Sequence, residues 1–484
     1  MKLKLAPFAL LLACSAGQIE PQRVVPDAAP PAPVGQPPGW DDQVRLTPAT
    51  NISQVKKIVQ VRLEAAPVDL EIVPGSKTRV WAYNGSVPGP LIRARAGDRL
   101  IVTFVNNLPE ESTVHWHGIR LPPEMDGVPG HSQAPVPPGG EFRYDFVVPD
   151  PGLYWYHPHV QSAKQVGDGL YGALLVEDPA EPPGLGDEVV MVLSDMSLTD
   201  DGQLVAPDAG GGIASLFGRE GERLLVNGHL NPTLEARPGR RQRWRLVNAA
   251  RSRYFQLAIE GHGFTRLGGG GGFLEQPQAV ERVMITPGQR ADVVVTPQGA
   301  AGDTLKVRWV AYDRGYGTTF MRPDVDVLSV HLAERAPGTD PPLPTRLRTI
   351  APLDPTGATV QELHLTSDVV DGNLVMGING KPSGTGPPLY AHLGETQVWN
   401  VTNDIAFAHP FHIHGFFFQV LETSDAQGPL PAGPLEWRDT ADVPAKGKMR
   451  LAVRFDDRPG MWMFHCHILD HADAGMMGEV MLLP

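Results

Sequence analysis

The sequence predicts an all-β protein made of three β-sandwich domains. Its 49 prolines and 53 glycines favour many short strands joined by turns, and no segment keeps a helical period of apolar residues. Three segments run from a glycine to an asparagine and alternate in polarity as half-buried strands do: residues 97–106, 239–248 and 394–403. An Asn-Gly turn signal precedes each of them. Because the segments recur about every 140 to 155 residues, the size of a sandwich, we expect one domain around each.

The first 45 residues resemble a leader and a tether rather than part of a sandwich. Residues 1–14 contain two lysines, a short apolar run and small residues, which is typical of an export signal and too short to span a membrane. The last four, LLAC, resemble a bacterial lipobox, although an ordinary cleavage site among small residues is the alternative. The Pro-rich residues 15–45 suit a stiff tether. We expect an exported protein of the periplasm or cell envelope, attached to the membrane only by lipid on Cys14.

The three repeat copies divide the rest of the chain into domains of similar length. We expect the first domain over residues 46–182, the second over 183–345 and the third over 346–484. A net charge of −13 without a basic patch gives no reason to expect nucleic acid as a partner. No sequence motif indicates an oligomeric state.

Paired histidines mark the first and third domains but not the second. Each pair has the form His-x-His, and two of the pairs stand nine and eleven residues after the asparagine that ends the repeat strand. The same offsets in the middle copy give Leu257 and Ile259, so we expect the middle domain to be a spacer without metal ligands. The four pairs are His115/His117, His157/His159, His412/His414 and His465/His467.

The His-x-His spacing is suited to metal binding. Residues i and i+2 of a strand share a face and lie about 6.6 Å apart, so each pair points two imidazoles at one place. A single pair is more often structural. Eight histidines that converge without metal, however, would leave buried ring nitrogens unsatisfied or charged. Four pairs matched between two repeat copies therefore indicate a metal site.

Cys466 adds a soft ligand to this set. With Cys14 at the processing site, it is the only cysteine left in the folded body, so we expect no intramolecular disulfide. A thiolate, two imidazoles and a distant thioether make up the blue-copper ligand set. The further ligands within reach are His409, His471 and Met476. Since Cys466 lies between His465 and His467, its side chain faces the other side of the strand, and electrons can pass through a few bonds between two sites.

As a set, these motifs resemble those of the multicopper oxidases, the family of laccases, cuprous oxidases and ferroxidases, over nearly the whole mature chain. The resemblance implies three cupredoxin-like Greek-key domains and four copper ions. It implies a type 1 copper that takes single electrons from a reductant and a trinuclear cluster that reduces O2 to water. The implied type 1 ligands are His409, Cys466 and His471, with Met476 as weak axial ligand. The implied type 2 ligands are His115 and His412, and the type 3 ligands are His117, His157 and His467 on one ion and His159, His414 and His465 on the other.

The same resemblance places an acid beside the cluster. Asp126 lies nine residues after His117, where a proton-relaying acid is expected, and an ordinary Asp-Gly turn is the alternative. Many bacterial members of the family carry a glutamate directly after the second type 1 histidine, but this chain has Ala472 there. Asp470 or Asp473 could serve instead, so the proton route stays open.

The sequence therefore predicts a laccase-like oxidase that uses O2 and a small reductant: a phenol, an aromatic amine, Cu(I) or Fe(II). The residues expected to take part in catalysis are Asp126, Cys466, His465 and His467. A dedicated cuprous or ferrous oxidase is the alternative within the family, weakened because Ile405 and Ala406 stand where copper-resistance members have polar or sulfur ligands. A copper-storage or structural member is the non-enzymatic alternative, and the complete ligand set argues against it.

Overall fold

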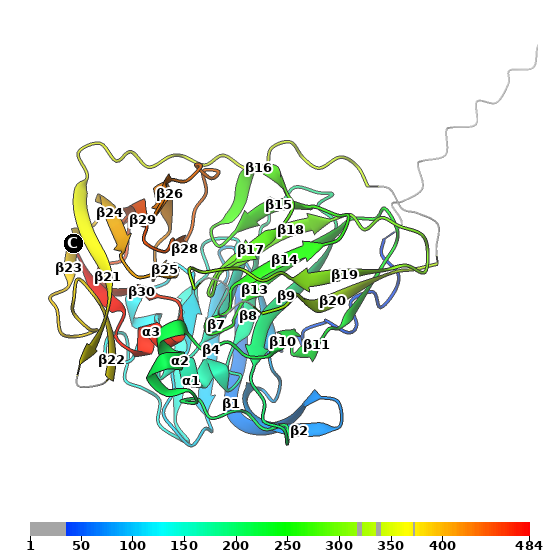
Figure 1. The fold of residues 1–484 in the computed structure, drawn as a ribbon, viewed down its shortest axis with the longest axis horizontal. Helices are drawn as coiled ribbons and strands as arrows, with labels where there is room; N and C mark the ends of the chain where they lie inside the picture. Colours follow the sequence, from blue (N-terminus) through cyan, green and yellow to red (C-terminus); the bar gives the residue numbers. More distant parts are fainter. Residues whose placement is uncertain (1–34, 317–321, 335–339, 371–372) are drawn as a thin grey trace, which may run out of the picture. The chain divides into compact units, whose positions relative to one another are not determined.

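The computed structural model describes residues 35–316, 322–334, 340–370 and 373–484 and confirms the all-β class (Figure 1). In this part of the chain, six sheets form three sandwiches that follow one another along the sequence, and the helices are short. The predicted leader, including Cys14, lies outside the described residues. Among the described residues, no helix has the length and apolar character needed to cross a bilayer.

The first sandwich carries two histidine pairs on neighbouring strands. Its sheets have the orders β2-β1-β4-β6 and β3-β8-β7-β5. β5 pairs antiparallel with β7, so that His115 stands opposite His157. Its elements are β1 (Ile58–Val73), β2 (Ser76–Tyr83), β3 (Gly89–Arg95), β4 (Arg99–Asn106), β5 (His115–His117), η1 (Pro123–Met125), β6 (Glu141–Val147), β7 (Gly152–His157), α1 (Ser162–Gly167) and β8 (Gly172–Glu177).

The second sandwich has sheets of the same kind without the histidines. The orders are β11-β10-β9-β13-β18-β15-β16 and β12-β20-β19-β14-β17. Leu257 and Ile259 of β14 are buried in its core. Its elements are β9 (Asp187–Met196), α2 (Gly211–Phe217), β10 (Arg223–Val226), β11 (His229–Leu230), β12 (Thr233–Ala236), β13 (Gln242–Asn248), β14 (Phe255–Ile259), β15 (Phe264–Gly269), β16 (Gly272–Val280), β17 (Val283–Ile285), β18 (Arg290–Val295), β19 (Thr304–Trp309) and β20 (Val325–Leu332).

The third sandwich again carries two histidine pairs on neighbouring strands. Its sheets have the orders β22-β21-β24-β29-β26-β27 and β23-β31-β30-β25-β28. β25 pairs with β30, so that His412 stands opposite His465 and Phe411 opposite Cys466. Its elements are β21 (Thr359–Val370), β22 (Asn373–Ile378), β23 (Leu389–His392), β24 (Thr396–Asn403), β25 (His409–Ile413), β26 (Phe418–Asp425), β27 (Gly428–Pro429), β28 (Thr440–Val443), β29 (Lys448–Arg454), β30 (Gly460–Cys466), α3 (Leu469–Asp473) and β31 (Met477–Leu483).

The asparagine that ends each repeat strand has the same structural task in all three sandwiches. The strands β4, β13 and β24 each pair in parallel with a long strand at the start of their domain. The terminal asparagine side chain donates to at least two backbone carbonyls and accepts the N–H two residues ahead. The three asparagines are Asn106, Asn248 and Asn403. These bonds satisfy buried backbone groups and fix the loop that leads into β5, β14 or β25, the strand that bears the histidines or their apolar counterparts.

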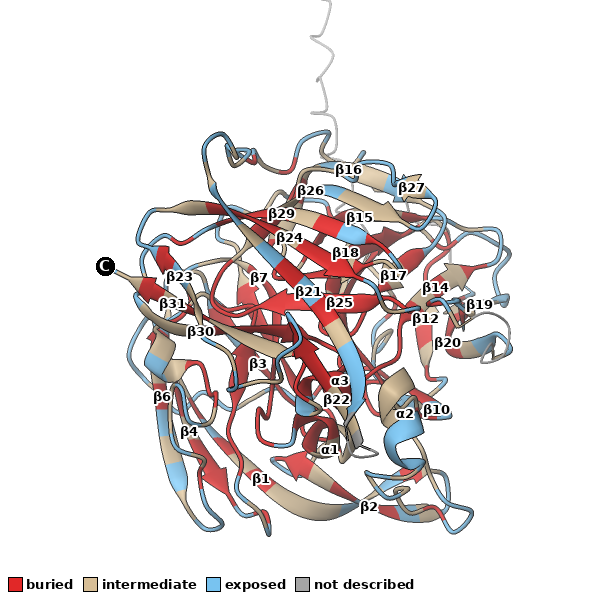
Figure 2. Ribbon diagram, turned by 60° about the vertical axis from the view of Figure 1, so that its left-hand side comes forward, coloured by how far each residue is buried: buried red, intermediate tan, exposed pale blue. Residues whose placement is uncertain are grey.

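A continuous hydrophobic core joins the first and third sandwiches. One buried cluster contains Trp116 and Tyr144 of the first sandwich together with Trp399 and Phe464 of the third. Figure 2 shows β7 and β25 as buried along their length. The histidine strands of the outer domains are therefore held in the interior by apolar packing on both sides.

Residues 35–45, which the sequence assigns to a tether, pack against the second sandwich. Val44 is fully buried in its core, and Trp40 packs against the same cluster. The side chain of Gln36 donates to the carbonyls of Arg240 and Arg241 at 3.2 Å. Apolar side chains in a solvent-exposed tether would stay in water, so the described part of this segment is a packed arm of the second domain rather than a free linker.

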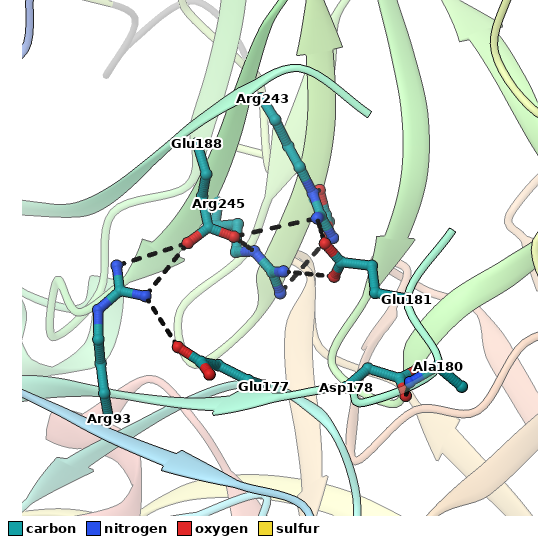
Figure 3. A network of polar contacts seen from close by, with 9 residues as sticks. Arg93, Glu177, Asp178, Ala180, Glu181, Glu188, Arg243 and Arg245 are labelled. Atoms are coloured by element: carbon teal, nitrogen blue, oxygen red, sulfur yellow. Dashed lines mark hydrogen bonds and ion pairs between the residues drawn. The ribbon is translucent and has the colours of Figure 1, made fainter. Parts of the chain in front are cut away.

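An ion-pair network fastens the first sandwich to the second (Figure 3). Arg93 of β3 lies 3.5 Å from Glu177 of β8 and 3.5 Å from Glu188 of β9. Arg245 of β13 donates to Glu188 at 2.5 Å and to Glu181 at 2.8 Å. Several partly buried charges that share partners hold a geometry better than isolated surface pairs do. The network thus links the neighbouring edges of the first two sandwiches.

Candidate metal centre

The histidine pairs of the first and third sandwiches meet in one buried cluster. The rings of His115 and His412 lie 6.0 Å apart, centroid to centroid. The rings of His117 and His412 stack at 3.9 Å. All eight paired histidines are at most 8% exposed. The structure therefore brings together all the histidines that the sequence predicts for the site.

The eight histidines fall into groups whose candidate ligand atoms lie within 4.8 Å of one another. Two groups contain the same residues as the two type 3 sets that the family resemblance implies. A third group contains the implied type 2 pair and one further histidine. The groups are His117/His157/His467, His159/His414/His465 and His115/His117/His412, and a fourth joins His115 and His414 to Asp126.

Most of these rings are held by one nitrogen and leave the other without a partner. Nδ1 of His115 donates to the carbonyl of Asp126 at 2.8 Å, and Nδ1 of His412 donates to the carbonyl of Asp439 at 2.9 Å. Among the eight paired histidines, the buried ring nitrogens without a hydrogen-bond partner in the described part of the chain are Nε2 of His115, His157, His159 and His412, Nδ1 of His117, and both nitrogens of His467. A buried polar atom without a partner costs about 1–3 kcal/mol. Metal ions would satisfy the whole set at once, and anchoring of the opposite nitrogen is usual for metal-bound histidine.

Burial lowers the pKa of seven of these imidazoles and keeps them neutral: His117, His157, His159, His412, His414, His465 and His467. It lowers the pKa of His465 to about 3, and the neighbouring His414 adds to the effect. It lowers the pKa of His414 to about 4, and His115 adds to the effect while Asp126 opposes it. A neutral imidazole has a lone pair to offer a metal ion, whereas an imidazolium does not. These seven imidazoles are thus in the protonation state that metal binding requires.

Cys466 lies in a second buried cluster directly behind the first. Its Sγ lies 3.6 Å from Nδ1 of His471 and accepts the N–H of Ile468 at 3.4 Å. The ring of His409 lies 5.0 Å from that of His471, and both nitrogens of His409 lack a partner among the described residues. Met476 is fully buried, and its carbonyl accepts the N–H of Cys466 at 3.1 Å. The structure therefore gathers the four residues of the expected type 1 set.

The chemistry of this second cluster fits copper. Burial raises the pKa of Cys466 well above its ordinary value, so a thiolate forms here only beside a cation. A thiol, two imidazoles and a thioether are soft donors, which select copper over calcium or magnesium. The absence of a second cysteine from the described residues speaks against an iron–sulfur cluster or a structural zinc site of the cysteine-rich kind.

Asp126 lies beside the histidine cluster, where the family resemblance places an acid. Nδ1 of His414 donates to its Oδ2 at 2.8 Å, and Nδ1 of His115 lies 3.2 Å from its Oδ1. Burial alone would raise the pKa of Asp126, but His414 and His115 outweigh it and hold the pKa below its ordinary value. The carboxylate therefore bridges His115 of the first sandwich and His414 of the third.

The two alternative acids have other partners. Asp470 accepts from Arg219 and from the hydroxyl of Ser252. Asp473 accepts the N–H groups of Ser162 and Ala163 at the start of α1. These bonds tie α3 to the first and second sandwiches, so the carboxylates on either side of Ala472 both have structural partners.

A buried acid that the sequence reasoning missed lies next to the cluster. Oδ1 of Asp439 lies 3.4 Å from Nε2 of His117, and Oγ1 of Thr440 lies 3.2 Å from the same nitrogen. Arg290 of β18 donates to Asp439 at 2.9 Å, and both side chains are 1% exposed. No motif marks these residues. They reach the site because Thr440 stands opposite His412 in the β25–β28 ladder, a pairing that only the fold reveals.

The outer edge of the second cluster is covered by α2. Nε2 of His471 donates to the carbonyl of Leu216 at 3.0 Å. The hydroxyl of Tyr316 and the guanidinium of Arg314 both donate to the carbonyl of Phe217 at 2.7 Å. His409 and His471 are accordingly 0% exposed. The sequence of α2, GGIASLF, contains no methionine, so the cover offers no thioether to a metal ion.

Comparisons with known sequences agree with this site. Sequence models described as multicopper oxidase match residues 65–181, 187–307 and 353–484. The multicopper oxidase MmcO of Mycobacterium tuberculosis is 33% identical over 463 residues, covering 87% of this chain and 86% of the relative. A laccase of Bacillus subtilis is 27% identical over 466 residues, covering 83% of this chain and 89% of the relative.

Solved structures give the same result. A multicopper oxidase from Campylobacter jejuni, described as a metallo-oxidase, superimposes with a TM-score of 0.81 and 30% identity, covering 94% of this chain and 98% of its own. A multi-copper oxidase from Pseudomonas thermotolerans gives a TM-score of 0.74 and 33% identity, covering 89% and 100%. Three cupredoxin-like sandwiches with a shared histidine cluster define a copper-dependent oxidoreductase. The chain belongs to the multicopper oxidase family.

Proposed function

We propose that this chain is a laccase-like oxidase that takes single electrons from phenols, aromatic amines or low-valent metal ions and passes them to O2, which is reduced to water. The observation that carries the proposal is the cluster of histidines with unpaired ring nitrogens, shared by the first and third sandwiches and joined through β30 to Cys466. Unpaired buried nitrogens of this number have no structural use without metal.

The donor groups support four copper ions. When bound, the type 1 copper supplies one-electron oxidation of the reductant, and the other three supply the four-electron reduction of O2. His409, Cys466, His471 and Met476 would hold the type 1 ion. His115 and His412 would hold the type 2 ion, His117, His157 and His467 one type 3 ion, and His159, His414 and His465 the other.

The protein's own residues contribute positioning and proton transfer. Cys466, the last residue of β30, lies between His465 and His467 in the chain, so a covalent path of a few bonds joins the two clusters. Asp126 accepts from His414 and lies against His115, and we assign it the delivery of protons to the O2-reducing side. Asp439 and Thr440, at the start of β28, hold the ring of His117, and Arg290 donates to the carboxylate of Asp439 and orients it.

One observation favours the alternative of a dedicated metallo-oxidase. Nε2 of His471 donates to the backbone carbonyl of Leu216, so a large phenol cannot contact this edge of the imidazole. A metal ion is smaller and needs less space to approach the site. The superimposable Campylobacter jejuni protein is described as a metallo-oxidase. Against this alternative, the cover has no methionine and Ile405 and Ala406 offer no polar or sulfur ligand.

Copper stoichiometry combined with O2 uptake tests the proposal. We expect four copper ions per purified chain, a blue absorption from the thiolate, and sustained O2 uptake with phenols as well as with Cu(I) or Fe(II). Cys466→Ser is the matched control and should lose one copper ion and the blue absorption. Uptake with the metal ions alone would favour the metallo-oxidase, and full copper loading without sustained uptake would overturn both enzymatic functions.

The location of the protein is a separate proposal that rests on the sequence around Cys14. We propose export and lipid attachment at this cysteine. Membrane fractions of cells that express the full chain should contain the protein, and Cys14→Ser should move it to the soluble fraction. Mass spectrometry of the mature N-terminus supplies the second measurement, and an unmodified N-terminus at another residue would contradict the lipid anchor.

A further inference from the structure

Large reductants have no direct route to the type 1 residues. The imidazoles of His409 and His471 are 0% exposed, and α2 with its carbonyl at Leu216 closes the outer edge of His471. Phe407 stacks on His409 at 5.0 Å and lies 5.7 Å from His471. Electrons from a bulky donor must therefore cross protein before they reach this site.

A stacked pair of tyrosines leads inward from the surface beside this cover. Tyr312, in the connection that follows β19, is 39% exposed. Its ring stacks on that of Tyr254 with centroids 5.8 Å apart and an interplanar angle of 16°. Tyr254 is only 2% exposed, and the guanidinium of Arg314 lies 5.0 Å from the centroid of its ring. The two oxidisable phenol side chains are thus in contact, one at the surface and one in the interior.

The inner tyrosine connects to the type 1 residues through the β25–β28 ladder. The hydroxyl of Tyr254 donates to Oδ1 of Asp442 at 2.7 Å. Asp442 stands opposite Pro410 in the ladder, and the next pair joins Val443 to His409. A hydrogen bond and a short stretch of backbone therefore separate the phenol of Tyr254 from a residue that we assign to the type 1 site.

We propose that Tyr312 is a surface site at which bulky phenolic reductants give up single electrons, which reach the type 1 site through Tyr254. This proposal rests on the proposed oxidase function and names the class of donor that the covered type 1 site cannot contact. The hydroxyl of Tyr254 donates to the carboxylate of Asp442, which can take up its proton. Tyr254 is therefore suited to reversible oxidation.

The transfer balances in electrons and protons. Tyr254 gives one electron to the type 1 site and its hydroxyl proton to Asp442. The Tyr254 radical then takes one electron from Tyr312 and recovers its proton from Asp442, while Tyr312 releases its hydroxyl proton to water. The phenol at the surface restores Tyr312 by giving it one hydrogen atom and leaves as a phenoxyl radical. The net change is one electron delivered inward and one proton released to solvent for each phenol oxidised.

Two features of the local electrostatics agree with this sequence of steps. Burial raises the pKa of Tyr312 to about 12, so its resting form at neutral pH is the phenol. Burial raises the pKa of Asp442 to about 6, opposed by Tyr254, Arg314 and Arg438. At neutral pH, Asp442 is therefore mainly a carboxylate that can accept a proton.

The test compares one phenol in two sizes. Guaiacol and guaiacol coupled to a large dextran are each mixed with the oxidised, copper-loaded protein, and loss of the blue absorption is followed by stopped flow. Tyr312→Phe keeps the ring and removes the redox-active hydroxyl, and Tyr390→Phe is the matched control because Tyr390 is 55% exposed on β23. We expect Tyr312→Phe to slow reduction by the dextran-linked phenol about tenfold or more, with a smaller effect on free guaiacol. Equal rates in the two variants would overturn the proposal.

A radical measurement tests the relay without turnover. A flash-activated ruthenium photo-oxidant in solution should produce a tyrosyl radical on the copper-free protein whose EPR spectrum shows a hydrogen-bonded oxygen. This signal should disappear in Tyr254→Phe and in Tyr312→Phe and persist in Tyr390→Phe. A signal unchanged in Tyr254→Phe, or lost equally in the control, would overturn the relay. Since this readout needs no copper, it separates failure of the relay from failure of the oxidase function, which would show as absent copper or absent O2 uptake in the unmodified protein.

Discussion

Strands β5, β14 and β25 occupy the same place in the three sandwiches, after the same asparagine, yet they bury different side chains. β14 of the middle sandwich buries Leu257 and Ile259, at 2% and 3% exposure, inside an apolar core. At the same offsets, β5 and the end of β25 with the residue that follows it bury pairs of histidines whose ring nitrogens are in part unpaired. The fold thus needs a buried side chain at these two positions but has no need of an imidazole.

The difference shows that the outer sandwiches lose folding stability at the positions that carry the metal ligands. An apolar side chain at a buried strand position stabilises by about 1.5–3 kcal/mol, whereas an unpaired buried nitrogen destabilises by about 1–3 kcal/mol. The outer domains carry this penalty many times over, and metal binding offsets it. The described residues of the middle domain include no buried histidine nitrogen without a partner, and this domain supplies Arg290 and the cover α2 instead. Changes in the outer strands should therefore act on metal and activity, and changes in β14 on stability alone.

The largest effect should come from Cys466→Ser. The hydroxyl of serine does not form an anion at neutral pH and is a poor ligand for copper, so the blue absorption should vanish. Turnover should fall by about 1000-fold or more, because electrons can no longer leave the reductant. O2 uptake and the visible spectrum measure both effects. Unchanged blue absorption would contradict the assignment of the thiolate.

Leu257→Ala tests the other side of the comparison. Removal of a buried leucine side chain should lower the free energy of unfolding by about 2–5 kcal/mol, as measured by chemical denaturation. Copper content per folded chain should stay the same, since β14 contributes no ligand. Val360→Ala on β21, where the side chain is 52% exposed, is the matched control and should change stability by less than about 0.5 kcal/mol. Loss of copper from the Leu257→Ala protein would contradict the separation of roles.

Asp126→Asn should separate the two halves of the reaction. Asparagine can keep the contact to His414 but cannot deliver protons, so reoxidation of the reduced protein by O2 should slow about 100-fold. Reduction of the type 1 site by a phenol should keep its rate. Stopped-flow measurements of bleaching and of recovery of the blue absorption give the two rates separately. Equal rates in the variant and the unmodified protein for both steps would remove Asp126 from the proton route.

The all-β class and the pairing of the histidines could be predicted because both depend on local spacing, whereas the division of the pairs among metal ions came only from the family resemblance. Alternating polarity and a fixed offset from Asn106 and Asn403 can be seen in the sequence whatever the arrangement of the domains. Residues i and i+2 of a strand share a face, so the two histidines of each pair are expected to point to the same side. The role of the terminal asparagine, by contrast, became clear only from its bonds to backbone carbonyls that are distant in sequence.

The residues that the sequence reasoning missed all depend on long-range pairing. Asp439 reaches His117 through the register of β25 with β28, and Arg290 arrives from a different domain. The helix α2 begins with two glycines, which are poor helix formers, so the local sequence did not predict a helix that covers His471. Val44 in the predicted tether is buried because a core in the second sandwich accepts it, which no property of the Pro-rich segment reveals.

The smallest effect, and the most direct test of the comparison, comes from exchanging the two kinds of side chain. In copper-free protein, His467→Leu should raise the free energy of unfolding by about 1–3 kcal/mol, because both ring nitrogens of His467 lack partners among the described residues. In copper-loaded protein, the same change should lower it, because a ligand is lost. The reciprocal change Leu257→His should lower the free energy of unfolding in both forms, since it places an unpaired imidazole in an apolar core. Denaturation of each variant with and without copper measures the four values, and a His467→Leu protein that is less stable without copper would show that the histidines stabilise the fold by themselves.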